Sequence, residues 1–157
     1  MPGGKQTDIA AVLSKKLVAR EELFITTKIP AGIGILTGLC VGGAEKALRQ
    51  VKEDLKELNV SQVDLVLLHH PCLLSSQNDA MWKGLEQALA QNLTRAIGVS
   101  NYKKADLQKL LQGATVKPAV DQCDMGVGAY DAETIAYAQS EGITYEACAA
   151  RRVSSPG

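Results

Sequence analysis

Apolar residues in this chain come in short runs that alternate with longer amphipathic segments. The clearest run covers residues 63–68 and is followed at once by His69, His70 and Pro71. Such a run predicts a strand that is buried on both faces, as in a parallel sheet. Proline cannot donate a ladder hydrogen bond, so Pro71 marks the exit into a loop. We therefore expect a titratable imidazole at the carboxyl end of a buried strand.

The same alternation runs through the rest of the chain. Strand-like runs occupy 22–28, 96–101, 118–123 and 143–148, and helical patterns occupy 7–17, 44–59, 80–92, 105–112 and 132–140, with a polar loop over 75–79. Strands that alternate with helices predict right-handed βαβ units and a parallel sheet. Five strands fit an open doubly wound sheet or part of an eight-stranded barrel, and the periodicity does not choose between them.

A glycine-rich apolar stretch lies at 31–43. Its glycines Gly32, Gly34 and Gly38 come close to a dinucleotide-binding fingerprint, but their spacing does not match G-x-G-x-x-G. We therefore interpret this stretch as a flexible loop.

Composition narrows the class of protein. The chain has 157 residues, of which 46% are hydrophobic, so one globular domain is expected. A net charge of +0 and an aromatic content of 4% argue against nucleic-acid binding. The N-terminus lacks an apolar signal core, and no run is long enough to span a membrane.

The four cysteines indicate the redox state of the cellular compartment. None of Cys40, Cys72, Cys123 and Cys148 is in C-x-x-C spacing, and the chain is neither small nor loop-rich. We interpret all four as free thiols in a reducing compartment and predict a cytoplasmic protein.

Each predicted strand ends on a polar or titratable side chain. In chain order these are Lys28, His69, Ser100 with Asn101, Gln122 and Cys148. The carboxyl ends of parallel strands share one rim, where α/β folds bind ligands. A lysine beside a histidine can lower the pKa of a proton donor or orient a carbonyl, and Ser, Asn and Gln can hold a carboxamide. The simpler alternative is that strands end in polar residues because the loops that follow them are exposed to solvent.

Two other chemistries are conceivable at this rim. His69, His70 and Cys72 offer metal ligands, but adjacent side chains on a strand point to opposite faces, so we expect no metal. Cys148 beside His69 suggests a nucleophile, but nothing visible activates it, and a buried thiol is the favoured interpretation.

Several segments together resemble one family. REELFITTK, DLKELNVSQVDLVLLHHP, RAIGVSN, VKPAVDQC and EGITYEA occur in this order and resemble the aldo-keto reductase family over residues 7–147, with a divergent tail at 149–157. The resemblance implies an α/β fold, a partial (β/α)8 TIM barrel of about five parallel strands. It implies metal-free reduction of aldehydes or ketones, small-molecule carbonyl substrates, by NADPH. We predict that residues 1–157 form a single incomplete domain of this kind.

The resemblance also implies roles for particular residues. Lys28 matches the active-site lysine and His69 the active-site histidine of the family. Ser100, Asn101 and Gln122 match the residues that hold the nicotinamide carboxamide. These are the residues that the strand ends had already singled out.

Departures from the family pattern are equally specific. Cys148 stands where the family stacks a tyrosine on the nicotinamide, Asp121 replaces an asparagine, and His70 replaces a tryptophan. The family's aspartate, proton-donor tyrosine, last strand and adenosine-phosphate segment have no counterpart in this sequence. We therefore expect a central fragment of marginal stability that binds NADPH weakly and does not turn over by itself. The alternatives are an inactive remnant that serves as an interaction module or has no function, and a different enzyme that uses Cys148 and His69.

Overall fold

The computed structural model describes residues 6–30, 32–33, 36–37, 40–126 and 128–148, so the tail at 149–157 lies outside the described residues. Its elements in chain order are α1 (Gln6–Leu13), the 3-10 turn η1 (Arg20–Glu22), β1 (Thr26–Ile29), β2 (Gly32–Ile33), β3 (Leu36–Thr37), α2 (Gly43–Leu58), β4 (Val63–Leu68), α3 (Ser75–Ala90), β5 (Thr94–Ser100), α4 (Lys104–Gly113), β6 (Val120–Asp124), α5 (Ala132–Ser140) and β7 (Thr144–Cys148).

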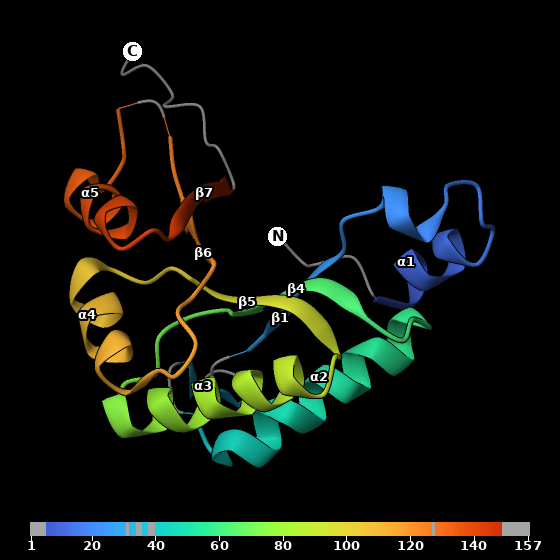
Figure 1. Ribbon diagram of the computed structural model, residues 1–157, viewed down its shortest axis with the longest axis horizontal. Coiled ribbons are helices and arrows are strands. Elements are labelled where there is room, and N and C mark those ends of the chain that lie inside the picture. The colour runs from blue at the N-terminus through green and yellow to red at the C-terminus, as the bar shows by residue number, and fades with distance from the viewer. Residues whose placement is uncertain (1–5, 31, 34–35, 38–39, 127, 149–157) are drawn as a thin grey trace.

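Five strands form one sheet in the order β1-β4-β5-β6-β7, and every neighbouring pair is parallel. Helices α2 and α3 run side by side along one face of this sheet (Figure 1). Strands β1 and β7 are its two edges, so the sheet is not closed within the part of the chain that the structure describes. The predicted five parallel strands alternating with helices are confirmed.

Two local predictions are wrong. The glycine-rich stretch is not a plain loop, because β2 and β3 pair there as an antiparallel hairpin. Helix α3 begins at Ser75, within the stretch predicted as a polar loop. The reason is tertiary: Asn78 in its first turns is buried, and its Oδ1 accepts hydrogen bonds from the Cys72 backbone and from the Tyr102 hydroxyl.

The cysteine interpretation is also wrong for two of the four residues. Cys40 and Cys72 form a disulfide across 32 positions, with Cα atoms 5.7 Å apart, whereas Cys123 and Cys148 are free. Sequence spacing could not reveal the pair, because the fold alone brings the two loops together. A cytoplasmic location stays a prediction, but the argument from four free thiols no longer supports it. None of the helices in the described ranges is long and apolar enough to cross a bilayer.

Helices α2 and α3 approach so closely that one position requires glycine. A Cβ added at Gly84 of α3 would lie 2.5 Å from the Ala44 carbonyl oxygen and 2.6 Å from the Ala47 Cβ. We expect Gly84→Ala to lower the free energy of unfolding by about 2 kcal/mol, because the helices must separate to admit the methyl group. Urea unfolding followed by circular dichroism measures this loss.

Gly113 provides the matched control for that substitution. It is the last residue of α4, and an added Cβ would come no nearer than 3.7 Å to its closest neighbour, Asp79. Gly113→Ala should therefore leave stability unchanged or slightly raised. Equal losses in the two variants would contradict the close-approach explanation.

Candidate functional site

The ends of the parallel strands bring the predicted site residues to one rim of the sheet. Lys28 in β1 donates a hydrogen bond from Nζ to Ser100 Oγ in β5 at 3.1 Å, although β4 lies between the two strands. Ser100 Oγ in turn donates to the backbone oxygen of Gln122 in β6 at 2.7 Å. Three strand ends are thus joined through one hydroxyl, and Lys28 and Ser100 lie on the same face.

Asn101 extends this network to the end of β4. Its backbone is in the left-handed region, with φ of 62°, which asparagine tolerates better than most residues. Its Nδ2 donates to the His69 backbone oxygen at 2.9 Å and to Ser100 Oγ at 3.1 Å, and its backbone N–H donates to the Gln122 oxygen at 3.0 Å. The turn at Asn101 therefore fixes the His69 backbone relative to β5 and β6.

His69 and His70 lie just beyond the last residue of β4. Their rings are stacked, with centroids 4.3 Å apart and an interplanar angle of 20°, so the expectation that they point to opposite faces is wrong. That expectation assumed a strand, and β4 ends at Leu68. Burial first, then the neighbouring His70 and Lys28 charges, lower the pKa of His69 below its usual value. His69 is therefore a neutral imidazole at pH 7, able to donate one ring N–H without a charge.

Metal binding finds no support in this arrangement. Among the described residues there is no group of three His, Cys, Asp or Glu side chains that could hold an ion. Cys72, the third ligand considered beside His69 and His70, is bound in the disulfide with Cys40.

Glu146 is a member of the rim that the sequence interpretation missed. It lies opposite Gln122 in the register of β6 and β7, and its Oε1 accepts a hydrogen bond from Gln122 Nε2 at 2.8 Å. The period-2 alternation of a strand places Glu146 on the same face as Cys148, so the alternation along β7 could have revealed it. The rim thus carries a carboxylate beside its glutamine.

Cys148 shows no sign of activation as a nucleophile. Its Sγ lies 3.5 Å from Asp124 Oδ1, and burial, with that carboxylate, raises the pKa of the thiol despite the opposing charge of Lys28. Nucleophilic cysteines have lowered pKa values. The thiol is half-buried rather than buried, but the preference for an unreactive thiol agrees with this geometry.

Asp121, which replaces the family's asparagine, lies buried behind the rim. Its side chain is 0% exposed, its Oδ1 accepts a weak hydrogen bond from Cys123 Sγ at 3.3 Å, and its Oδ2 has no hydrogen-bond partner among the described residues. Burial raises the pKa of Asp121 to about 6, although hydrogen bonds from Cys123 and the Tyr102 backbone oppose the rise. An ionised carboxylate is poorly accommodated here.

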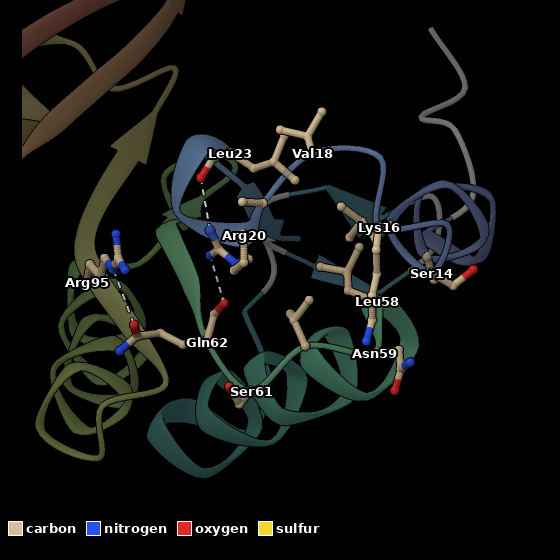
Figure 2. Close-up of a pocket in the computed structure, with 14 residues that line it drawn as sticks. Ser14, Lys16, Val18, Arg20, Leu23, Leu58, Asn59, Ser61, Gln62 and Arg95 are labelled. Atoms are coloured by element: carbon tan, nitrogen blue, oxygen red, sulfur yellow. Dashed lines mark hydrogen bonds between the residues drawn. The ribbon is translucent and has the colours of Figure 1, made fainter.

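A cavity of about 620 Å³ lies at the opposite end of the strands (Figure 2). It is lined by α1, the segment before β4 and the first residues of β5. Arg20 in its wall donates to the backbone oxygens of Leu23 and Gln62 and to the buried Asp64 carboxylate. The Arg20 guanidinium therefore stabilises the fold, and the rim is the better candidate for a catalytic site.

Comparisons with known proteins agree with the sequence resemblance. A sequence model described as the Aldo/keto reductase family matches residues 3–149. The glyoxal reductase of Bacillus subtilis (strain 168) is 34% identical over 130 residues, which cover 83% of this chain and 44% of the relative. The NAD/NADP-dependent indole-3-acetaldehyde reductase of Schizosaccharomyces pombe is 29% identical over 148 residues, which cover 91% of this chain and 48% of the relative.

Solved structures give the same result for the fold. A crystal structure of aldo-keto reductase AKR2E5, a silkworm (Bombyx mori) protein, complexed with NADPH matches with a TM-score of 0.81 at 29% identity, covering 92% of this chain and 45% of that chain. An aldo/keto reductase from Brucella melitensis matches with a TM-score of 0.83 at 24% identity, covering 92% and 54%. The chain spans about half the length of the relatives it matches. The predicted resemblance and part-barrel architecture are confirmed.

Proposed function

Because this chain belongs to the aldo/keto reductase family, we propose that its rim binds the nicotinamide end of NADPH and orients an aldehyde or ketone for reduction. The observation that carries the proposal is the hydrogen bond between Lys28 and Ser100, which joins the predicted catalytic and cofactor-binding groups in one cluster. The aldehyde class is supported by relatives named for glyoxal and for indole-3-acetaldehyde reduction.

The donor set fits a carboxamide. A nicotinamide carboxamide presents one acceptor oxygen and one N–H₂ donor, and Ser100, Asn101 and Gln122 offer a hydroxyl and two side-chain amides at adjacent strand ends. NADPH supplies a hydride when bound. In our proposal these three residues hold the carboxamide. This requires Gln122 to exchange its bond to Glu146 for one to the cofactor, and Ser100 to exchange one of its bonds to Lys28, Asn101 or the Gln122 backbone.

Two further residues act on the carbonyl. His69 donates a ring N–H to the carbonyl oxygen, and its neutral state keeps this a hydrogen bond rather than a proton transfer. Lys28 places a cation beside the same rim, where it stabilises negative charge that develops on the oxygen. We assign both as catalytic residues.

Proton donation is the step for which this chain offers little. Among its four tyrosines, Tyr102 and Tyr145 both have pKa values raised mainly by burial, which disfavours loss of the proton. A tyrosine activated by Lys28 would have a lowered pKa. We propose that the 157-residue chain by itself binds the cofactor weakly and does not turn over.

NADPH binding to the 157-residue chain tests the cofactor assignment. We expect Gln122→Ala to raise the Kd by on the order of tenfold, because a hydrogen bond to the carboxamide is lost. Glu146→Ala should lower the Kd, since it removes a competing acceptor and a negative charge. The change in nucleotide fluorescence on titration measures both effects.

Gln139→Ala is the matched control, because Gln139 lies exposed on α5, away from the rim. It should bind NADPH as the wild type does. Equal binding by all four proteins would contradict the assignment, and absence of binding by the wild type would favour the interaction-module alternative. Detectable glyoxal-dependent oxidation of NADPH that Lys28→Met abolishes would contradict the predicted absence of turnover.

A further inference from the structure

We propose that the Cys40–Cys72 disulfide is a redox switch that positions His69 and Asn101 at the rim. In the oxidised protein, the disulfide holds the loop after β4 in place. When the disulfide is reduced, this loop and the turn at Asn101 can move. The consequence for NADPH rests on the proposed function, but the movement of His69 does not.

The bond joins the loop that follows β4, which contains His69, to the segment between β3 and α2. Cys72 follows His69 by three residues, with Pro71 between them. Cys40 lies between β3 and α2, at the far end of the segment that begins with β1. A single covalent link thus ties the loop that carries His69 to the chain that connects β1, by way of β2 and β3, with α2.

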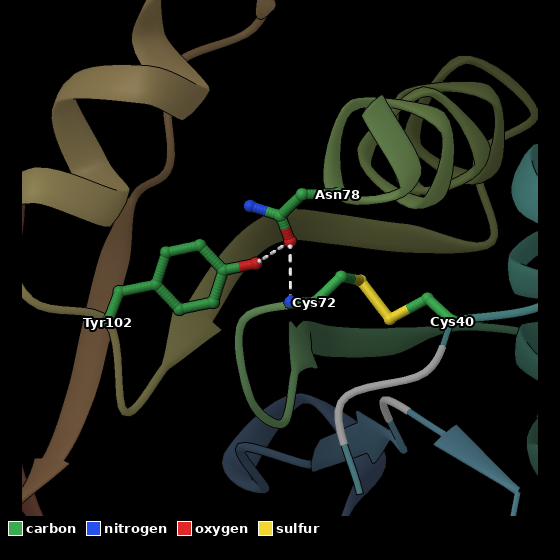
Figure 3. Close-up of a disulfide and its surroundings, with 4 residues drawn as sticks. All are labelled: Cys40, Cys72, Asn78 and Tyr102. Carbon is green, nitrogen blue, oxygen red and sulfur yellow. Dashed lines mark hydrogen bonds between the residues drawn. A yellow bond between two sulfur atoms is a disulfide. The ribbon is translucent and has the colours of Figure 1, made fainter. Parts of the chain in front are cut away.

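Asn78 connects Cys72 to the turn that follows β5 (Figure 3). Its Oδ1 accepts one hydrogen bond from the Cys72 backbone N–H at 3.3 Å and another from the Tyr102 hydroxyl. Asn78 is 5% exposed and Tyr102 is 1% exposed, so the hydrogen bond between these two side chains is not exchanged readily for water. Tyr102 directly follows Asn101, whose Nδ2 holds the His69 backbone oxygen at 2.9 Å. Cys72, Asn78, Tyr102 and Asn101 therefore form a continuous path back to His69.

Apolar packing contributes little to holding this loop. Leu73 and Leu74, which follow Cys72, are 76% and 57% exposed. Without the disulfide, Cys72 retains partial packing against the core and one long hydrogen bond to Asn78, and a bond of that length is weak. The position of the loop should therefore depend on the covalent link.

Reduction requires a dithiol, either a small reagent or a protein of the thioredoxin class. A thiolate of the dithiol attacks the sulfur of half-buried Cys72, because Cys40 is only 2% exposed, and Cys40 leaves as a thiolate. The second thiol of the reductant then displaces Cys72. Two electrons and two protons have passed to Cys40 and Cys72, and the reductant has become a disulfide.

Comparison of oxidised and reduced wild-type chain tests the switch. Alkylation and intact mass should count two free thiols before dithiothreitol treatment and four afterwards. In proton NMR we expect the His69 ring resonance to move on reduction, and its pKa to rise toward the usual value as water enters. The NADPH Kd should rise on the order of tenfold, and the melting temperature should fall by roughly 10 °C.

Two controls separate the switch from general unfolding and from other thiols. The indole N–H of Trp82, which is buried and bonded to the Val116 oxygen, should keep its resonance in both states. The double variant Cys40→Ser/Cys72→Ser should resemble the reduced protein and show no response to dithiothreitol, and the wild-type comparison remains decisive if this variant does not fold.

The outcomes are distinguishable. Four free thiols before reduction, or an unchanged His69 resonance after it, would overturn the switch. Movement of His69 without NADPH binding in either state would support the switch and refute the proposed function instead.

Discussion

Replacing Asp121 with asparagine is expected to raise the free energy of unfolding at pH 8 by about 3 kcal/mol. The Asp121 side chain is completely buried, and its pKa is raised from 3.8 to about 6, chiefly by loss of water. Each pKa unit corresponds to about 1.4 kcal/mol, so the ionised carboxylate destabilises the folded state by about 3 kcal/mol above pH 6. Asparagine has nearly the same shape and carries no charge.

The pH dependence gives this prediction its sign. Between pH 3.8 and about 6 the folded chain holds a proton on Asp121 that the unfolded chain has lost. Stability from this group is therefore fully present below pH 3.8 and is lost as pH rises through about 6. Urea unfolding of both proteins from pH 4 to pH 8 should show a gap that opens with rising pH, with asparagine the more stable.

Asp131 offers a control of opposite sign. It caps α5 by accepting hydrogen bonds from the Thr134 backbone and hydroxyl, and these lower the pKa of its carboxyl. The stability that Asp131 contributes is present at neutral pH and is lost as pH falls through its lowered pKa. The advantage of wild type over Asp131→Asn should therefore appear as pH rises to the ordinary carboxyl pKa of 3.8 and stay nearly level from there to pH 8, in contrast to the gap expected for Asp121→Asn. A flat difference for Asp121→Asn would show that its carboxylate is solvated.

Trp82→Ala should lower the free energy of unfolding by about 4 kcal/mol, the largest loss that we expect from a single truncation. Trp82 in α3 is 1% exposed, and its Nε1 donates to the Val116 oxygen at 3.0 Å, ahead of β6. Truncation leaves a cavity between α3 and the sheet and an unpaired carbonyl. Circular dichroism is the appropriate measurement, because Trp82 is the one tryptophan in the sequence.

Trp82→Phe separates packing from the hydrogen bond. Phenylalanine keeps an aromatic ring in the core but offers no donor to Val116, so the expected loss is smaller, about 2 kcal/mol. A loss as large as that of alanine would mean that the hydrogen bond, rather than the volume, dominates at this position.

The candidate site was largely predictable because strand ends in parallel sheets share an edge. Ser100 is the last residue of β5, whereas Lys28 lies one residue before the end of β1 and Gln122 two residues before the end of β6, and the structure joins the three through the Ser100 hydroxyl. Glu146 was not predicted because it lies two residues before the end of β7, on the face shared with Cys148, and not at the strand end itself. Their assigned roles in catalysis and cofactor binding stay proposals.

The local pattern of apolar and polar residues determined the order of strands and helices. Residues 63–68 are apolar apart from Asp64 and form a strand, and the 3.6-residue period of 44–59 forms a helix, because such patterns can be buried in few ways. The length of the apolar run at residues 63–68 and the position of Pro71 also determined where the loop that contains His69 begins. The sequence by itself therefore determined the fold class and the rim.

Contacts between distant segments decided the rest. The Cys40–Cys72 bond, the early start of α3 at Ser75 and the raised pKa of Asp121 each depend on partners or burial that residues far along the chain provide. Neither residue type nor spacing encodes such distances, because they arise only when the helices pack on the sheet. For that reason the residue types at the rim could be predicted from the sequence. The Cys40–Cys72 disulfide and the Asn78 hydrogen bonds that support the rim could be found only in the tertiary structure.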